Sequence, residues 1–353
     1  METNKPAGLE EDERAVTRSK SGDLRRIIPG VIISIVSLAI VLYFADLGEL
    51  WDALVLADSR LILLAVLLIL LWLMVRGLFW RTLLQDKAAY MDVFWTLNEG
   101  YLINNLLPFR LGEVARAFLL GKKAGLSFWE ILPSILIERI MDITYAIGLF
   151  FLLLPFVVGI SGQGSFAIVM GAGILLVFLV LYLLARNQDW ALRMNEKIGQ
   201  RFPIIRRLTA KIVPSFITGL AVLTDGRRFL RAVGWVTLNW AIAFLEYYVL
   251  VLAFVPEAKL LWSSFSLIVA ALGIAVPSSP GGVGVFEAAM VGALALFGVN
   301  ASAALAAAIT AHVIQYAITG VLGIFALVRD GESLTGLYKR VRSIQSEAEV
   351  QTE

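Results

Sequence analysis

The sequence contains no cysteine, one histidine and few charged residues, and each shortage excludes a class of function. Without cysteine there is no disulfide, no thiolate nucleophile and no thiolate-bound metal. The single histidine, His312, excludes a metal site built from several histidines, and no Gly-x-x-x-x-Gly-Lys-Ser/Thr nucleotide loop occurs. Charged residues make up 16% of the chain, and the net charge of +2 is too small to indicate nucleic-acid binding. We therefore expect no metal, no cofactor and no nucleic-acid partner.

Apolar residues are abundant and are gathered into long runs. They make up 59% of the chain, against about 45–50% in a typical soluble domain. A bilayer core is about 30 Å thick and is crossed by about 20 apolar residues in a helix. The runs predict an all-α, polytopic transmembrane helix bundle with these strong spans: 27–45, 61–82, 131–158, 166–185, 232–254 and 303–328.

Lysine and arginine in short loops indicate which ends of the spans are cytoplasmic. The segment 186–231 contains ten of them, whereas loops 46–60 and 255–262 contain only Arg60 and Lys259. We expect a cell (inner or plasma) membrane protein with both termini cytoplasmic. Its parts are a disordered leader (1–26), a membrane domain (27–328) and a polar tail (329–353). Within the domain, the basic segment 186–231 is predicted to be an amphipathic helix on the anionic leaflet or a solvated linker.

A shorter apolar stretch, 91–107, is interrupted by Pro108. Proline lacks an amide hydrogen and disfavours helix in the residue before it, so the helix should stop there and restart near Gly112–Glu113. A restarted helix exposes free amide hydrogens and a positive dipole end. Arg110 and Arg116 lie beside this restart, and the combination suits a phosphate or carboxylate. A cytoplasmic interfacial helix whose arginines extend to water fits the same pattern.

A second break lies in Pro277-Ser-Ser-Pro-Gly-Gly-Val-Gly284, where two prolines and three glycines in eight residues cannot remain helical. Irregular backbone at membrane depth persists only when it is buried in protein or lines a wet cavity. Ser279 could cap the next helix or bind a ligand, and Glu287 would lie about one turn into that helix. An ordinary turn outside the membrane is the alternative. The flanking runs form either a re-entrant hairpin or two full spans, so the total is six to eight.

Several ionisable residues fall inside the predicted spans, where a charge usually faces a cavity or a partner. Glu138 and Asp142 are four residues apart and share a helix face, and Arg139 can pair with Asp142. These three are expected either to line a cavity or to form a local cluster that reaches the interface.

Three further polar residues lie in other spans. Glu246 lies near the middle of 232–254 and should face a cavity or form a hydrogen bond to a neighbouring helix. Arg76 is expected to extend to the membrane interface. His312 is expected to make a hydrogen bond in the core, with a proton relay as the alternative.

Three ordered motifs carry a resemblance. They are Asn-Leu-Leu-Pro-Phe-Arg-Leu-Gly-Glu-Val-Ala-Arg-Ala (105–117), Glu-Arg followed by Asp (138–142), and Pro-Gly-Gly-Val-Gly-Val-Phe-Glu (280–287). Over 28–328 the chain resembles the flippase-like membrane domain of lysylphosphatidylglycerol synthases. The residues that match the motifs are Asn105, Pro108, Arg110, Gly112, Glu113, Arg116, Glu138, Arg139, Asp142, Pro280, Gly281, Gly282, Gly284 and Glu287.

The resemblance departs from the family pattern at two places. Aminoacyl-transferring members carry a large soluble domain after the membrane part, whereas about 25 polar residues follow Val328 here, so synthase activity is not expected. Many members also have a basic residue before the last glutamate, where this chain has Phe286. Detailed substrate specificity therefore does not transfer.

These observations favour a flippase-like transporter over an enzyme, acting in the lipid bilayer on an anionic or polyprenyl-phosphate lipid. One alternative is a membrane enzyme acting on such a lipid, although the usual Asp-rich metal cluster is missing. The other is a non-catalytic subunit whose partner is a lipid- or envelope-modifying enzyme. No residue is predicted to be catalytic. The expected substrate-binding residues are Asn105, Arg110, Glu113, Arg116, Glu138, Arg139, Asp142, Glu246, Ser279, Gly281, Gly282 and Glu287.

Overall fold

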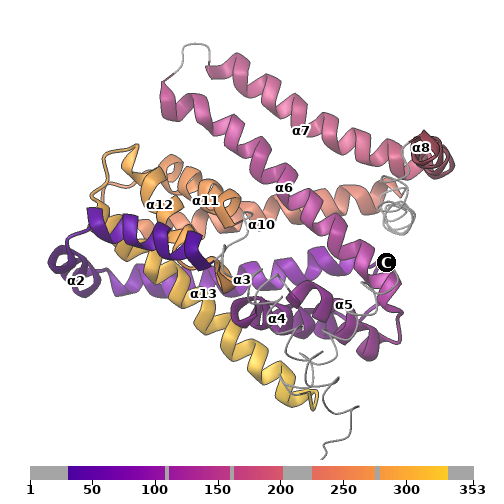
Figure 1. The fold of residues 1–353 in the computed structure, drawn as a ribbon, viewed down its shortest axis with the longest axis horizontal. Coiled ribbons are helices and arrows are strands. Elements are labelled where there is room, and N and C mark those ends of the chain that lie inside the picture. The colour runs from indigo at the N-terminus through magenta and orange to yellow at the C-terminus, as the bar shows by residue number, and fades with distance from the viewer. Residues whose placement is uncertain (1–30, 108–110, 160–162, 202–224, 275–278, 333–353) are drawn as a thin grey trace, which may run out of the picture.

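In the computed structural model, every regular element of the described residues is a helix, as the apolar runs predict. The structure describes residues 31–107, 111–159, 163–201, 225–274 and 279–332. The predicted leader, most of the tail, Pro108 and Arg110 lie outside these ranges. In Figure 1, α6 (Phe128–Val158) and α7 (Gln163–Arg186) form a long hairpin along one side of the bundle.

Four of the described helices are long and apolar enough to cross a bilayer: α3 (Ser59–Leu83), α6, α10 (Gly226–Leu252) and α13 (Ala301–Arg329). The chain is therefore a multi-pass membrane protein, and four predicted spans are confirmed to within six residues at each end. Large apolar side chains such as Leu63 remain exposed on α3, as expected for a face that contacts lipid tails. The predicted span 166–185 coincides with α7.

The region predicted as loop 46–60 contains a helix instead. The helix Val31–Phe44 is followed by α2 (Leu47–Leu56), and the two are bent by 87° relative to each other. Asp46 caps α2, because its Oδ1 accepts hydrogen bonds from the backbone amides of Gly48 (2.8 Å) and Glu49 (3.0 Å). This side-chain cap is the local reason that the chain turns and resumes as a helix.

Two helical hairpins occupy the places where the sequence is broken. The first consists of α4 (Tyr90–Leu106) and α5 (Leu111–Ala124), which pack against each other. The second consists of α11 (Leu260–Ile274), the short 3₁₀ turn η2 (Pro280–Gly282) and α12 (Val285–Ala295). At 1.5 Å per residue, α11 is about 22 Å and α12 about 16 Å long, both shorter than a bilayer core of about 30 Å. These lengths favour the re-entrant interpretation of 263–298.

Helix α13 joins the two hairpins, because it packs against both α4 and α12. Its N-terminal half presents small side chains, and Ala304, Ala308 and Ala311 are buried. Small residues allow close backbone approach, which drives helix association in membranes where apolar burial does not.

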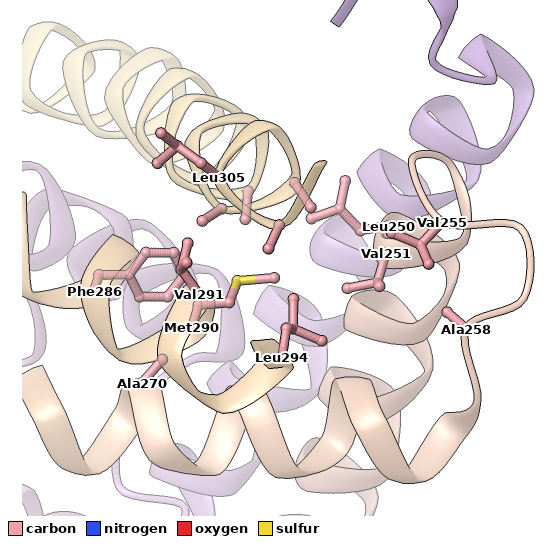
Figure 2. Packing of buried hydrophobic residues seen from close by; sticks show 14 of the residues in the cluster. Leu250, Val251, Val255, Ala258, Ala270, Phe286, Met290, Val291, Leu294 and Leu305 are labelled. Atoms are coloured by element: carbon pink, nitrogen blue, oxygen red, sulfur yellow. The ribbon is translucent and has the colours of Figure 1, made fainter. Parts of the chain in front are cut away.

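The largest apolar cluster lies where α10, α11, α12 and α13 meet. Figure 2 shows Phe286, Met290 and Leu294 of α12 in this cluster, together with Leu305 of α13 and Leu250 of α10. This cluster fixes α12 against α13 and thereby holds the motif glutamate of α12 beside the only histidine.

The basic segment 186–231 begins with an amphipathic helix, α8 (Gln188–Arg201), at the far end of α7 (Figure 1). Trp190 is 52% exposed and Met194 is 40% exposed, so apolar side chains alternate with cations on an open face. Residues 202–224 lie outside the described ranges, and α10 begins at Gly226.

Candidate functional site

An acid pair on α6 forms the centre of a buried ionic cluster. Arg76 of α3 is 3% exposed and donates to Glu138 Oε1 (2.5 Å) and to Asp142 Oδ1 (2.8 Å). The amide oxygen of Asn239 on α10 lies 3.5 Å from the same guanidinium. The predicted shared face of Glu138 and Asp142 is confirmed. The prediction that Arg76 extends to the interface is wrong, because two carboxylates on a neighbouring helix bind it inside the bundle.

Arg116 of α5 binds the other side of Glu138. Its Nη2 donates to Oε2 of Glu138 at 2.6 Å, and Nη1 donates to Oε1 at 3.3 Å. The guanidinium carbon lies 3.9 Å from the centre of the Trp80 ring, and Trp80 is held by a hydrogen bond to Ser134 (3.0 Å). An anion could reach Arg116, which is 1% exposed, only by displacing Glu138.

The outer edge of the cluster is an ion pair between α6 and α5. Arg139 Nε lies 2.9 Å from Glu113 Oε1, and the two side chains are 28% and 22% exposed. The prediction that Arg139 pairs with Asp142 is wrong, because Arg76 binds Asp142 and Arg139 reaches the carboxylate of the adjacent helix. Three guanidinium groups thus face three carboxylates, with a formal charge of zero. We call this set the charge network: Arg76, Glu113, Arg116, Glu138, Arg139 and Asp142.

The charge network differs in accessibility from one end to the other. Glu138 is fully buried, so an unpaired charge there would be strongly destabilising. Asp142 is 20% exposed, and with Arg139 and Glu113 it forms the open end. A charged ligand can exchange with a carboxylate at this end while the inner part stays neutralised. The arrangement is suited to binding a small anion reversibly.

The first hairpin is closed by its own side chains. The Gly112 amide, at the start of α5, donates to Asn104 Oδ1 (2.8 Å), so one of the free amides expected to bind an anion is already capped. A Cβ atom at Gly112 would lie 2.0 Å from the Gly100 carbonyl oxygen, so only glycine fits there. Asn105, predicted to bind substrate, instead donates to Thr319 Oγ1 of α13 (3.0 Å) in this structure.

The second break is a glycine turn, as predicted. Gly281, Gly282 and Gly284 have φ angles of 69°, 78° and 86°, which favour glycine. The Ser279 amide donates to Ser34 Oγ (3.0 Å), so the turn is fastened to the first membrane helix. The turn therefore lies against protein, in agreement with the rule that irregular backbone at membrane depth is buried.

Glu287 and His312 connect this turn to α13. One carboxylate oxygen of Glu287 accepts from the Gly284 amide (2.6 Å), and the other lies 2.6 Å from His312 Nδ1. His312 Nε2 lies 3.1 Å from the Gly281 carbonyl oxygen. The hydrogen bond expected of His312 in the core is confirmed, and its partner is the motif glutamate.

One face of α13 carries the contacts with both breaks. His312 and Tyr316 meet the glycine turn, Thr319 binds Asn105, and Gly323 lies against α4. Their spacing of four, three and four residues places them on one helix face. Helix α4 also lies against η2. The two broken segments therefore meet along α13, with His312 and Thr319 separated by about 10 Å at 1.5 Å per residue.

Glu246 of α10 is 5% exposed, as its depth in the span predicts. Among the described residues, no side chain or backbone group forms a hydrogen bond with its carboxyl group. The neighbouring Tyr247 is close enough to interact electrostatically with both Glu246 and Glu287. Glu246 thus lies near the second break and outside the charge network.

A further ionic cluster, which the sequence did not reveal, fastens the end of α13 to the first hairpin. Lys123 of α5 donates to Glu99 Oε2 of α4 (2.8 Å) and pairs with Asp330. Burial raises the pKa of Asp330, but hydrogen bonds with Lys123, Glu99 and Arg329 together outweigh burial and hold this pKa below its usual range. The cluster ties the residue after α13 to α4 and α5 through Lys123.

Sequence reasoning missed Arg76, Asn104 and Asn239 as members of the site. A signal existed for Arg76, since it lies seven residues before the end of α3, too deep for a short reach to water. No local pattern indicates that His312 faces Glu287, which is 25 residues away in the chain.

Comparisons with known proteins agree with the motifs. The family described as the lysylphosphatidylglycerol synthase TM region matches residues 27–323. The chain is 24% identical to Glycosyltransferase AglD of Haloferax volcanii over 344 residues, which cover 88% of the chain and 55% of that protein. It is 26% identical to a UPF0104 membrane protein of Methanothermobacter thermautotrophicus over 330 residues, which cover 86% of the chain and 96% of that protein.

A UPF0104 membrane protein of Methanocaldococcus jannaschii is 30% identical over 217 residues, which cover 61% of the chain and 88% of that protein. The chain thus spans about half the length of AglD and most of the length of these two UPF0104 relatives. No solved structure matches the chain.

Proposed function

Since the chain belongs to the lysylphosphatidylglycerol synthase transmembrane family, we propose that it binds a lipid through its phosphate headgroup and moves it between leaflets. The observation that carries this proposal is the charge network, which joins α3, α5 and α6 inside a membrane bundle. Ionised groups at membrane depth are costly and mark substrate or ion pathways. The lipid tails would remain in the bilayer while the headgroup enters the protein.

The open end of the charge network is the proposed contact for the phosphate. A phosphate can take the place of Glu113 on Arg139, because both present oxygen atoms to the guanidinium. The displaced Glu113 is 22% exposed and can turn to water, so the exchange leaves no buried charge unpaired. Arg116 and Glu138 would hold the inner part rigid. Arg110, which lies outside the described residues, is proposed as a second cation on the phosphate.

The second break is proposed to form the other wall of the pathway. Ser279, Gly281, Gly282 and Glu287 lie on or beside the glycine turn, and Glu246 lies nearby on α10. Asn105 would act through α13, because its side chain binds Thr319. We further propose that the basic segments and both termini face the cytoplasm and that the protein resides in the cell membrane.

The test is translocation of phosphatidylethanolamine carrying a fluorescent group on its headgroup, in proteoliposomes treated with membrane-impermeant dithionite. Protein-free vesicles protect the inner leaflet, whereas a translocating protein exposes all of the label. A polyprenyl phosphate is assayed in parallel. We expect translocation of at least one lipid, and a loss of about tenfold in rate in Arg139→Gln, which removes one charge-assisted contact.

The matched control is Arg60→Gln, which removes an exposed arginine in the first turn of α3, far from the charge network. This variant should translocate lipid as the unaltered protein does. If the inner-leaflet label of both lipids were protected from dithionite as fully as in protein-free vesicles, the proposal would be contradicted. So would an equal loss of rate in Arg60→Gln and Arg139→Gln.

A second candidate is a subunit that presents a lipid to a sugar-transferring enzyme. The observation in its favour is the relative named Glycosyltransferase AglD, whose similarity to this chain extends over 55% of its length. Under this reading the purified chain binds a polyprenyl phosphate without moving it. Co-purification of a sugar-transferring enzyme whose activity falls when the chain is removed would support this candidate.

A further inference from the structure

The only histidine of the chain lies between two hydrogen-bond acceptors. His312 Nδ1 is 2.6 Å from a Glu287 carboxylate oxygen, and Nε2 is 3.1 Å from the Gly281 carbonyl oxygen. The carbonyl oxygen can only accept, so Nε2 must carry a hydrogen. At Nδ1, one more proton must lie between the ring and the carboxyl group. The observed geometry therefore requires one proton more than the Glu287 carboxylate and a neutral His312 ring carry together.

The surroundings of the pair contain acids and phenols. Glu287 faces His312 from α12, and Tyr316 faces it from α13 with ring centres 4.5 Å apart. Tyr247 of α10 contacts Phe286, which itself lies against His312, and Glu246 immediately precedes Tyr247 on the same helix. No lysine or arginine of the described residues forms an ion pair with Glu287. Among these described residues, no fixed cation therefore competes with a proton for the Glu287 carboxylate.

The glycine turn depends on the contact that this proton completes. A Cβ atom at Gly281 would lie 1.5 Å from the Tyr316 hydroxyl oxygen, so the turn rests directly on α13. If the pair loses its proton, either Glu287 or Gly281 loses its hydrogen bond to His312. Because α4 lies against η2 and Asn105 is bound to α13, a shift of the turn is transmitted to the first hairpin.

We propose that Glu287 and His312 form a proton-binding site that couples proton movement to lipid movement. Binding of a proton from one aqueous side fastens the glycine turn to α13, and its release to the other side frees the turn. The coupling rests on the lipid translocation proposed above, whereas the proton site itself does not.

The proton site can be tested without any transport. Because the chain has one histidine, protein labelled with ¹⁵N-histidine and purified through a histidine-free tag gives the NMR signals of His312 alone. The ¹⁵N signals of both ring nitrogens are followed from about pH 5 to about pH 9, and we expect them to change as the Glu287–His312 pair gains or loses its proton, with Glu287→Gln abolishing or displacing this transition. Signals that do not change over this range would overturn the proton site. A transition unchanged by Glu287→Gln would do the same.

The coupling is tested by the steady-state leaflet distribution of the labelled lipid in vesicles with a pH gradient and a clamped membrane potential. One proton per lipid and a gradient of one pH unit predict an uneven distribution of up to about tenfold. His312→Gln should still translocate lipid but give an even distribution, whereas Gln315→Leu on the same helix should behave as the unaltered protein does. Lipid movement with an even distribution in the unaltered protein would overturn the coupling.

An uneven distribution that persists in His312→Gln would also overturn it. Absence of any lipid movement would reject the proposed translocation, and the NMR titration would still decide whether the proton site exists. Thermal unfolding of each variant separates a loss of coupling from a loss of folding.

Discussion

The charge network and the Glu287–His312 pair are both buried ionic contacts between helices, but they differ in whether their charges can be removed. The network has three arginines, whose guanidinium groups stay charged at any physiological pH. The pair depends on a histidine, a side chain that can bind and release a proton. Permanent charge suits the recognition of an anion, and removable charge suits a switch. We therefore propose that the two polar sites of this membrane bundle have separate tasks.

The two sites also differ in how they are supported. The charge network joins three long or medium helices, α3, α5 and α6, whose own backbones are regular. The Glu287–His312 pair fastens a glycine turn whose backbone has few hydrogen bonds of its own. Loss of a buried charge of the network should thus damage folding, whereas loss of the histidine contact should change the position of a turn. The following predictions test this contrast.

The largest effect is expected from Glu138→Gln. Glu138 is fully buried and binds both Arg76 and Arg116. Its neutralisation therefore removes the negative charge that both buried guanidinium groups share. We expect a loss of about 3–5 kcal/mol in the free energy of unfolding, measured by thermal or denaturant unfolding in detergent. Asp189→Asn on exposed α8 is the control and should stay within about 0.5 kcal/mol. Equal stability of the two variants would show that the charge network does not stabilise the folded protein.

Two glycines of α13 provide a matched pair for the contact between α13 and the first hairpin. A Cβ atom at Gly323 would lie 2.6 Å from Leu102 Cβ and 2.7 Å from the Asn98 carbonyl oxygen, whereas nothing lies within 4 Å at Gly320. Gly323→Ala should cost about 1–3 kcal/mol by overpacking. Gly320→Ala should be neutral or slightly stabilising, because alanine favours helix. Unfolding of both variants in the same detergent compares them, and an equal cost would refute the close contact.

Glu113→Gln should strengthen lipid binding. Glutamine competes less well than glutamate for Arg139, so a phosphate meets less competition at the open end of the charge network. We expect affinity for the labelled lipid to rise by about 3- to 10-fold, as measured by fluorescence titration in detergent. Lower affinity in this variant would mean that Glu113 itself contacts the headgroup.

The smallest effect concerns the tie at the end of α13. The folded state holds the pKa of Asp330 below its usual value of about 3.9, so this contribution to stability is present above that pH. It is lost as the pH falls through the lower folded pKa. Asp330→Asn should remove up to about 1 kcal/mol near neutrality and flatten the decline in stability under acid. Unfolding curves at several pH values measure this, and identical acid profiles would contradict the assignment.

The sequence predicted the fold better than the site, for physical reasons. Long apolar runs define α3, α10 and α13, and Pro and Gly mark the breaks at 107–111 and 275–284, because these signals are local. The capped helix α2 was missed, since Asp46 as a helix cap is a weak signal in a short loop.

Partner choice within the site could not be read from the chain. The spacing of Glu138 and Asp142 correctly placed both on one face, but the pairing of Arg139 with Asp142 failed because helices α3 and α5 supply competing partners. The contact of Arg76 with Glu138 joins residues 62 positions apart, and the contacts of Arg116 and His312 join consecutive helices across 22 and 25 positions. Such contacts depend on how the helices pack, which no single motif encodes.

The most direct test of the two-site account is a lipid-binding titration of Arg139→Gln and His312→Gln at about pH 6 and about pH 8, on either side of the usual histidine pKa. We expect Arg139→Gln to weaken binding by about tenfold at both pH values and to keep the pH response of the unaltered protein. We expect His312→Gln to keep the affinity and to lose the pH response. If the same variant lost both affinity and pH response, the separation of anion recognition from proton binding would be contradicted.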